Sequence, residues 1–151
     1  MVWAPNPVRD VAGNVLPHDD PVTIPSEWTL IRHVHPAQWH QDGQRPQSIA
    51  FSFSSGGSHS MSVDVEPPML VAGLAPTHYA FLAGKGAVRI TARKARELGM
   101  RVGPEPIDGN PHHGGIWAPN PAISENQLRR RRGELSRSCG VVALPPNGIA
   151  T

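Results

Sequence analysis

Proline and glycine interrupt this chain so often that long regular elements have little room to form. The 151 residues include 17 Pro and 15 Gly, which together exceed a fifth of the sequence. Proline ends helices and central strands because it lacks a backbone N–H, and glycine favours turns. The short segments between these residues predict short helices and strands joined by many loops. With 38% hydrophobic residues in 151, the chain is nevertheless long enough to bury a hydrophobic core.

Alternation of apolar and polar residues predicts three strands, over about 28–35, 47–53 and 60–65. Residues 100–102 fit a fourth, shorter strand after a glycine. Residue types that favour strands are enriched in these segments, and residue types that favour turns are enriched around them. We therefore expect a small, mostly antiparallel sheet of five to seven short strands.

Two segments carry helix signals. Thr91 can cap a short helix over 92–98, which ends at a glycine. Ser124 and the glutamine three residues later form a capping box for a longer helix over about 125–138. Together with the strands, these helices predict an α+β fold in which one short helix and one longer C-terminal helix pack on the sheet.

The chain divides by composition into three parts of one domain. Residues 1–27 are rich in proline and predict an extended arm that lies on the body or is partly disordered. Residues 28–116 hold the α+β core, and residues 117–151 hold the C-terminal helix and a tail. We expect that tail to fray from Val141 onward.

The stretch from Leu30 to His40 contains one arginine and three of the eight histidines. On a strand, Arg32 shares a face with Leu30 and Val34, so its charge is either at the sheet margin or buried with a partner. Asp64 and Glu66 are candidate partners. The alternative is that Arg32 holds a phosphate or carboxylate of a ligand through bidentate hydrogen bonds.

A ligand pocket is the first functional hypothesis. Arg32 would anchor a nucleotide or another small anion, and histidines would transfer protons or donate hydrogen bonds. Two of these, His112 and His113, follow a proline and precede two glycines in a loop over 104–116. The expected catalytic residues are Arg32, His35, His112 and His113, and the expected cofactor contacts are Ser48, Phe51, Ser52 and Ser62.

A metal site is an alternative. His33 and His35 lie two residues apart on one strand face, and His40 follows, which offers imidazoles for zinc or another divalent transition metal. The spacing matches no known zinc motif, and the single cysteine excludes a paired thiolate site.

A non-catalytic interaction protein is the other alternative. The sequence contains no GxSxG, phosphate-binding loop, GxGxxG or HExxH motif, and the Pro-rich arm could bind a protein partner. The four arginines 129–132 could contact nucleic acid or form a solvated helix face. A net charge of +2 with 17% charged residues does not by itself indicate nucleic acid. No segment has the length of a membrane span, and no leader is recognisable, so we expect a cytoplasmic protein.

Four segments together resemble a group of small uncharacterised bacterial proteins. They are Leu30–Pro36, Arg45–Phe51, Met61–Asp64 and the Asn110–His113 loop, which match an Arg-x-x-x-Pro, Ser-x-Ala-Phe, Met-Ser-Val and Asn-Pro-x-His pattern. More distantly, the opening is similar to ADP-ribosyltransferase-like folds. That resemblance implies NAD in a split sheet and an NAD- or nucleotide-using transferase or hydrolase. The chain departs from those families because it lacks an evident late catalytic glutamate.

Overall fold

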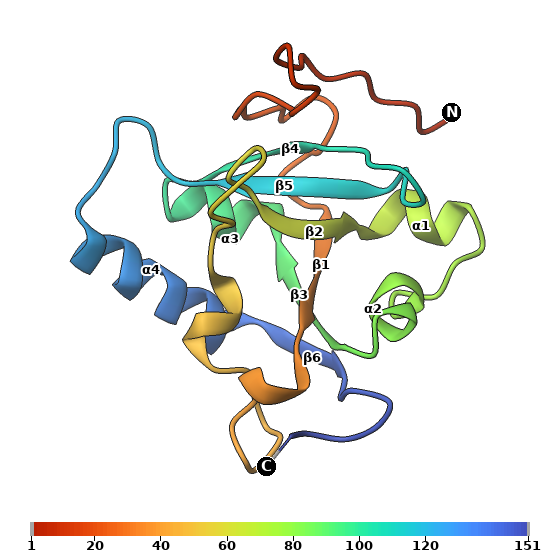
Figure 1. Cartoon of the computed structure of the whole chain (residues 1–151), viewed down its shortest axis with the longest axis vertical. Coiled ribbons are helices and arrows are strands. Elements are labelled where there is room, and N and C mark those ends of the chain that lie inside the picture. Colours follow the sequence, from red (N-terminus) through yellow and green to blue (C-terminus); the bar gives the residue numbers. More distant parts are fainter. Residues whose placement is uncertain (1, 151) are drawn as a thin grey trace.

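The computed structural model describes residues 2–150, and its sheet and helices are shown in Figure 1. These residues form six strands and four α-helices, with two short 3-10 helices, η1 and η2, between the first two strands. The strands are β1 (Thr29–Val34), β2 (Met61–Val65), β3 (Gly86–Thr91), β4 (Arg101–Pro104), β5 (His113–Trp117) and β6 (Gly140–Ala143). The helices are η1 (Pro36–Gln38), η2 (Ser48–Phe51), α1 (Glu66–Val71), α2 (His78–Leu82), α3 (Ala92–Glu97) and α4 (Glu125–Ser138).

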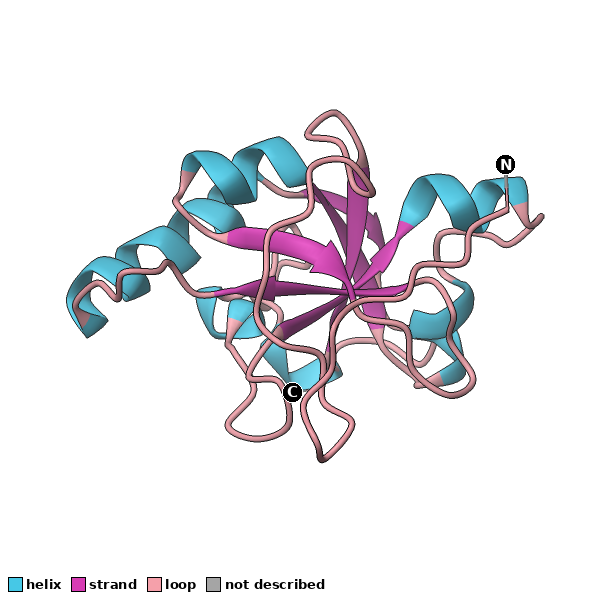
Figure 2. Ribbon diagram, turned by 90° about the horizontal axis from the view of Figure 1, so that it is seen from above, coloured by secondary structure: helices cyan, strands magenta, loops and turns pink. Residues whose placement is uncertain are grey.

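All six strands belong to one sheet in the order β4-β5-β2-β1-β3-β6, and every neighbouring pair is antiparallel. Seen from above in Figure 2, the helices lie around the strands, with α4 extending to one side. The predicted α+β class and antiparallel sheet are confirmed. The longest helix is C-terminal, as the capping box indicates.

The main core lies on one face of the sheet. Leu30 and Val34 of β1 pack there with residues of β2, β3, α3, α4 and η2. Ile31 points to the other face and packs with Ala80 of α2 and Ala87 of β3. This alternation is the one expected for a strand.

The two predicted helices begin as the sequence indicates. Thr91 accepts a hydrogen bond from Lys94 N at the start of α3, and Ser124 and Gln127 form the capping box of α4. Gly99 follows α3 with φ +79°, a conformation that favours glycine. Among the helices of residues 2–150, none is both long enough and apolar enough to cross a lipid bilayer.

Three expectations about local structure are wrong. Residues 48–51 form the 3-10 helix η2 rather than a strand, so Phe51 is buried while Ile49 is 58% exposed. The tail from Val141 pairs with β3 as strand β6. The end of the 104–116 loop is strand β5, whose Gly115 lies so close to Trp117 that a Cβ would be 2.7 Å from the indole ring.

The N-terminal arm lies against the body of the molecule, as Figure 1 shows. Val15 and Ile24 are buried, and Trp3 Nε1 donates to Pro111 O over 2.9 Å. Apolar burial and a long-range hydrogen bond both favour this packing over a solvated coil. The arm therefore covers the loop that leads into β5.

Candidate functional site

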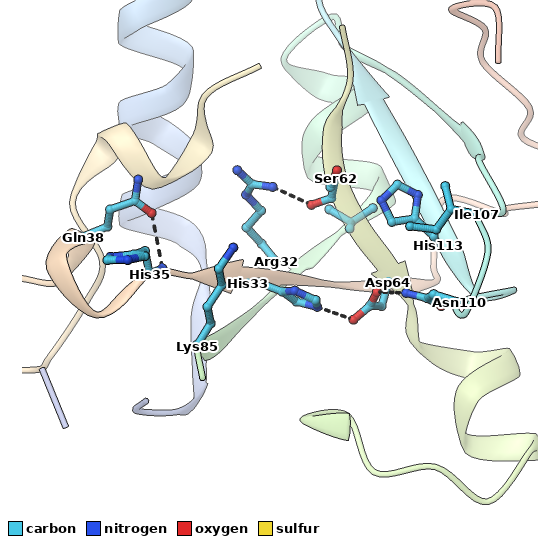
Figure 3. A pocket seen from close by; sticks show the side chains of 11 residues that line it. Arg32, His33, His35, Gln38, Ser62, Asp64, Lys85, Ile107, Asn110 and His113 are labelled. Atoms are coloured by element: carbon cyan, nitrogen blue, oxygen red, sulfur yellow. Dashed lines mark hydrogen bonds and ion pairs between the residues drawn. The ribbon is translucent and has the colours of Figure 1, made fainter. Parts of the chain in front are cut away.

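The sheet opens between β1 and β2. Within the described chain, β1 pairs with β2 only at Leu30↔Val65 and Ile31↔Asp64, whereas all of β1 from Thr29 to Val34 pairs with β3. Beyond Ile31 the two strands therefore diverge, and backbone ladder bonds no longer join them. This divergence creates space at the centre of the sheet, which Figure 3 shows from close by.

A cleft of about 520 Å³ lies at this opening. Consecutive residues of a strand point to opposite faces of the sheet. Since both Arg32 and His33 line the cleft, the cleft extends from one face of the sheet to the other past the edge of β1 that β2 leaves unpaired. Its lining is mainly polar and carries several cationic or imidazole groups. The lining residues are Arg32, His33, His35, Gln38, Ser62, Val63, Asp64, Lys85, Ile107, Asn110 and His113.

Arg32 bridges the opening without a carboxylate partner. Its Nε donates to Ala50 O over 2.9 Å and its Nη1 to Ser62 O over 2.7 Å. None of the ion pairs formed within residues 2–150 includes Arg32. Burial disfavours the charged form and lowers the pKa of Arg32 to about 10. The guanidinium is thus a charge held by carbonyl dipoles beside an open cleft.

The two expected partners of Arg32 are engaged elsewhere, so the prediction that either one neutralises it is wrong. Asp64 is fully buried and accepts from His33 Nε2 over 2.6 Å and from Asn110 Nδ2 over 2.8 Å. Glu66 binds Arg89. The anionic-ligand alternative for Arg32 remains a prediction.

Asp64 fixes the orientation of His33. A carboxylate only accepts hydrogen bonds, so Nε2 of His33 donates to it, and Nδ1 forms no side-chain hydrogen bond within residues 2–150. Asn110 occupies the other carboxylate oxygen. The ring is therefore held with one nitrogen committed and the other available, which is the arrangement that positions an imidazole for proton transfer.

His113 is held in a complementary way from the opposite side of the cleft. Its Nδ1 lies 2.7 Å from the carbonyl of Glu105, which can only accept, so Nδ1 carries the proton and Nε2 has a free lone pair. Burial lowers the pKa of His113, partly opposed by Glu105 and Asp64, and the nearby His33 lowers it further. At neutral pH the ring is uncharged and can accept a proton.

His35 and Lys85 complete the rim of the cleft. His35 Nδ1 accepts from Ala37 N at the start of η1, so the neutral ring carries its proton on Nε2 and acts as a donor. Lys85 directly precedes β3 and has no carboxylate partner within residues 2–150. Both groups could donate hydrogen bonds to an anion bound in the cleft.

The structure brings four of the expected site residues to the cleft, namely Arg32, His35, Ser62 and His113. His112 points elsewhere: its Nδ1 pairs with Tyr79 OH at 2.9 Å, and it lines a separate apolar groove. Ser48, Phe51 and Ser52 do not line the cleft, because they lie on or beside η2 rather than on a strand. Phe51 is part of the core, and Ser52 Oγ donates to Ile49 O.

Sequence reasoning missed three contributors. Asn110 stands in the loop that the sequence singled out, but its role in holding Asp64 depends on packing between distant segments. Lys85 stands beside a glycine before β3, and Gln38 stands within the histidine-rich stretch, and neither position by itself indicates a ligand site. Gln38 lies in η1 and caps it through Oε1, which accepts from His35 N over 3.3 Å. No local sequence signal identifies these three together.

The structure does not place the histidines of the metal hypothesis together as one set of ligands. In the described part of the chain, no group of three or more His, Cys, Asp or Glu side chains is arranged to hold a metal ion. His33 and His35 line the cleft, but His33 is bonded to Asp64 and His35 caps η1. His40 is outside the lining.

The basic helix does not present four equivalent arginines. Arg129 and Arg130 are exposed. Arg131 Nη1 donates to Leu98 O, and Arg132 lies 3.9 Å from Glu125. The expected continuous basic face is therefore limited to its first two residues.

Comparisons with protein-family models, curated proteins and solved structures found no match to this chain. The functional argument therefore depends on the chemistry of the cleft.

Proposed function

We propose that this protein binds a small anionic ligand of the nucleotide class in the cleft between β1 and β2. The observation that carries the proposal is the uncompensated charge of Arg32 at the opening of the sheet. A half-buried cation without a counter-ion is costly, and an anion that enters the cleft would offset this cost. A guanidinium is planar and carries only N–H donors, and the oxygens of a phosphate can accept two of them at once.

The other groups of the cleft support the same ligand class. Lys85 adds a second cation, and His35 adds a donor fixed by its cap bond. A cleft of about 520 Å³ has the volume of a small-molecule site. NAD is one candidate, given the resemblance to ADP-ribosyltransferase-like folds and the opening in this sheet.

The test is ligand binding with a matched pair of variants. We expect NAD, ADP-ribose and AMP to raise the unfolding midpoint and to give binding heat in calorimetry, whereas adenosine does neither. Arg32→Ala should weaken nucleotide binding by about 10- to 100-fold, the equivalent of about 1.5–3 kcal/mol for a charge-assisted hydrogen bond.

Arg101→Ala is the matched control. Arg101 also lies on a strand and also donates only to a backbone carbonyl, that of Ala118, but it does not line the cleft. Binding should survive this change. Equal responses to adenosine and AMP, or full binding by the Arg32 variant, would contradict the proposal.

A protein-interaction role is the second candidate, and one surface favours it. A groove of about 400 Å³ between the arm and α1 is lined largely by apolar groups, among them Trp28, Pro67 and Val71, the last of which is 85% exposed. Exposed apolar grooves of this kind are typical of binding surfaces. This role predicts a protein complex that Val71→Glu disrupts and Arg32→Ala does not, measured by sedimentation with an isolated partner.

A further inference from the structure

Two of the three histidines that line the cleft have different proton arrangements. His33 belongs to β1 and donates through Nε2 to Asp64, and His113 belongs to β5 and donates through Nδ1 to a carbonyl. Figure 3 shows both rings among the residues that line the cleft. Two imidazoles in different environments, beside an anion site, are the parts that a paired acid and base require.

The carboxylates argue against a reaction at a glycosidic bond. Such reactions place a free carboxylate beside a developing positive charge on the sugar. Asp64 already accepts from His33 and Asn110. Glu105 is buried, accepts from the hydroxyls of Ser58 and Ser60, and does not line the cleft. Proton transfer by imidazole is what the described groups can perform.

We propose that the cleft cleaves a ribonucleotide phosphodiester, with His113 as the general base, His33 as the general acid and Arg32 on the phosphate. This inference rests on the proposed anion site and names its substrate class. The step needs a nucleophile. The hydroxyl side chain of the lining, Ser62, forms no hydrogen bond to either ring within residues 2–150, so we assign this part to a neighbouring hydroxyl on the substrate. The ribose 2′-hydroxyl supplies that nucleophile.

The step balances without a metal or redox partner. Nε2 of His113 takes the proton of the 2′-hydroxyl, and the 2′-oxygen forms a bond to phosphorus. The bond from phosphorus to the 5′-oxygen of the next nucleotide breaks, and Nδ1–H of the protonated His33 gives its proton to that oxygen. The products are a 2′,3′-cyclic phosphate and a 5′-hydroxyl, and the two histidines return to their starting states by proton exchange with water.

The surrounding charges suit this transition state. The carboxylate of Asp64 holds the Nε2–H of His33 and leaves Nδ1 facing away from that bond, while burial lowers the pKa of His113 and keeps it uncharged at neutral pH. Arg32 and Lys85 both line the cleft, where negative charge develops on the phosphate oxygens. Asp64 and Asn110 are positioning residues, since they act through His33.

The experiment uses the full chain with EDTA and a short single-stranded RNA, with the products identified by mass spectrometry. We expect fragments that end in 2′,3′-cyclic phosphate. DNA and 2′-O-methyl RNA of the same sequence should stay intact, because neither has the nucleophile. Cleavage of either one at a comparable rate overturns the proposal.

Matched glutamine variants test whether His33 and His113 take part in the cleavage reaction. His33→Gln and His113→Gln keep an amide that can donate to Asp64 or to the Glu105 carbonyl, but neither can exchange a proton, so each should lower the rate at least about 100-fold. His40→Gln is the control outside the cleft and should cleave like the parent chain. Equal cleavage by all four proteins indicates a contaminating nuclease and overturns the assignment.

A binding measurement separates failure of this inference from failure of the proposed function. The parent chain and both cleft variants are titrated with a nucleoside 3′-monophosphate, which cannot be cleaved, and their fold is checked by circular dichroism. Binding without any RNA cleavage by the parent chain overturns the acid–base assignment and leaves the anion site in place. Absence of both binding and cleavage overturns the two proposals together.

Discussion

Arg32 on β1 and Arg89 on β3 lie on adjacent strands, but the fold compensates their charges differently. Arg89 forms two hydrogen bonds of 2.7 Å to Glu66, which also accepts from Thr29. Arg32 donates to two backbone carbonyls and has no carboxylate partner in the described chain. Accordingly, the hydrogen bonds that Arg89 donates to Glu66 raise the pKa of Arg89, while burial lowers that of Arg32. We call the first the complete site, because a carboxylate of the described chain balances its charge, and the second the incomplete site, because no carboxylate of the described chain pairs with Arg32.

The largest expected effect on stability is at the complete site. Arg89→Met leaves Glu66, which is only 4% exposed, with Thr29 as its remaining side-chain partner. Loss of the charged partner of this buried carboxylate should cost about 2 kcal/mol of the free energy of unfolding. The cost is less than for a fully buried pair, because the side chain of Arg89 is 40% exposed. Urea unfolding at pH 7 measures this. A cost no larger than that of Arg32→Met would contradict the comparison.

The same pair predicts a pH dependence. Hydrogen bonds from Arg89 are the main cause that lowers the pKa of Glu66 from its ordinary value of 4.5. The stabilisation is therefore present above pH 4.5 and is lost as the pH falls through the lower pKa of the folded state. In urea unfolding, the difference between the parent chain and Glu66→Gln should shrink as the pH is lowered from 7 toward 3. A constant difference would mean that the ion pair is not its source.

A smaller effect is expected at the incomplete site. Arg32→Met removes a poorly compensated charge, which stabilises the fold, and two hydrogen bonds, which destabilises it. Because these two effects oppose each other, the free energy of unfolding should change by less than about 1 kcal/mol. Nucleotide binding should nevertheless weaken by about 10- to 100-fold. Arg101→Met provides the reference for removal of an arginine bonded to a carbonyl alone. Strong destabilisation by Arg32→Met would identify Arg32 as a structural residue that joins β1 to β2.

The smallest expected effect concerns His113. Burial is the main cause that lowers its pKa from 6.5, with Glu105 and Asp64 opposing and His33 adding to the shift. Stability is therefore fully present above pH 6.5 and decreases as the pH falls through the lower folded-state pKa. His113→Gln should reduce the slope of stability between pH 6.5 and 5 by an amount worth less than about 1 kcal/mol. The slope that remains should include His112, whose pKa burial also lowers. An unchanged slope would show that His113 is solvated.

Local signals in the sequence predicted those parts of the fold that neighbouring residues determine. The alternation around Leu30, the Thr91 cap and the Ser124 capping box each act within a few residues, and β1, α3 and α4 follow them. Strand β5 was missed because its two glycines resemble a loop, although they serve close packing against Trp117 and Val65. Strand β6 was missed because its pairing with β3 joins segments about 50 residues apart.

By itself, then, the sequence determined the fold class and marked Arg32, His35, Ser62 and His113 as residues of interest, since residue chemistry and strand alternation are local properties. Only the tertiary structure decided which carboxylate belongs to which cation. The sequence alone allows Glu66 to pair with either Arg32 or Arg89. The order of the strands in the sheet places Glu66 beside Arg89 and leaves Arg32 at the opening between β1 and β2. Pairing across a sheet depends on strand order and register, and these are set by the packing of the whole chain.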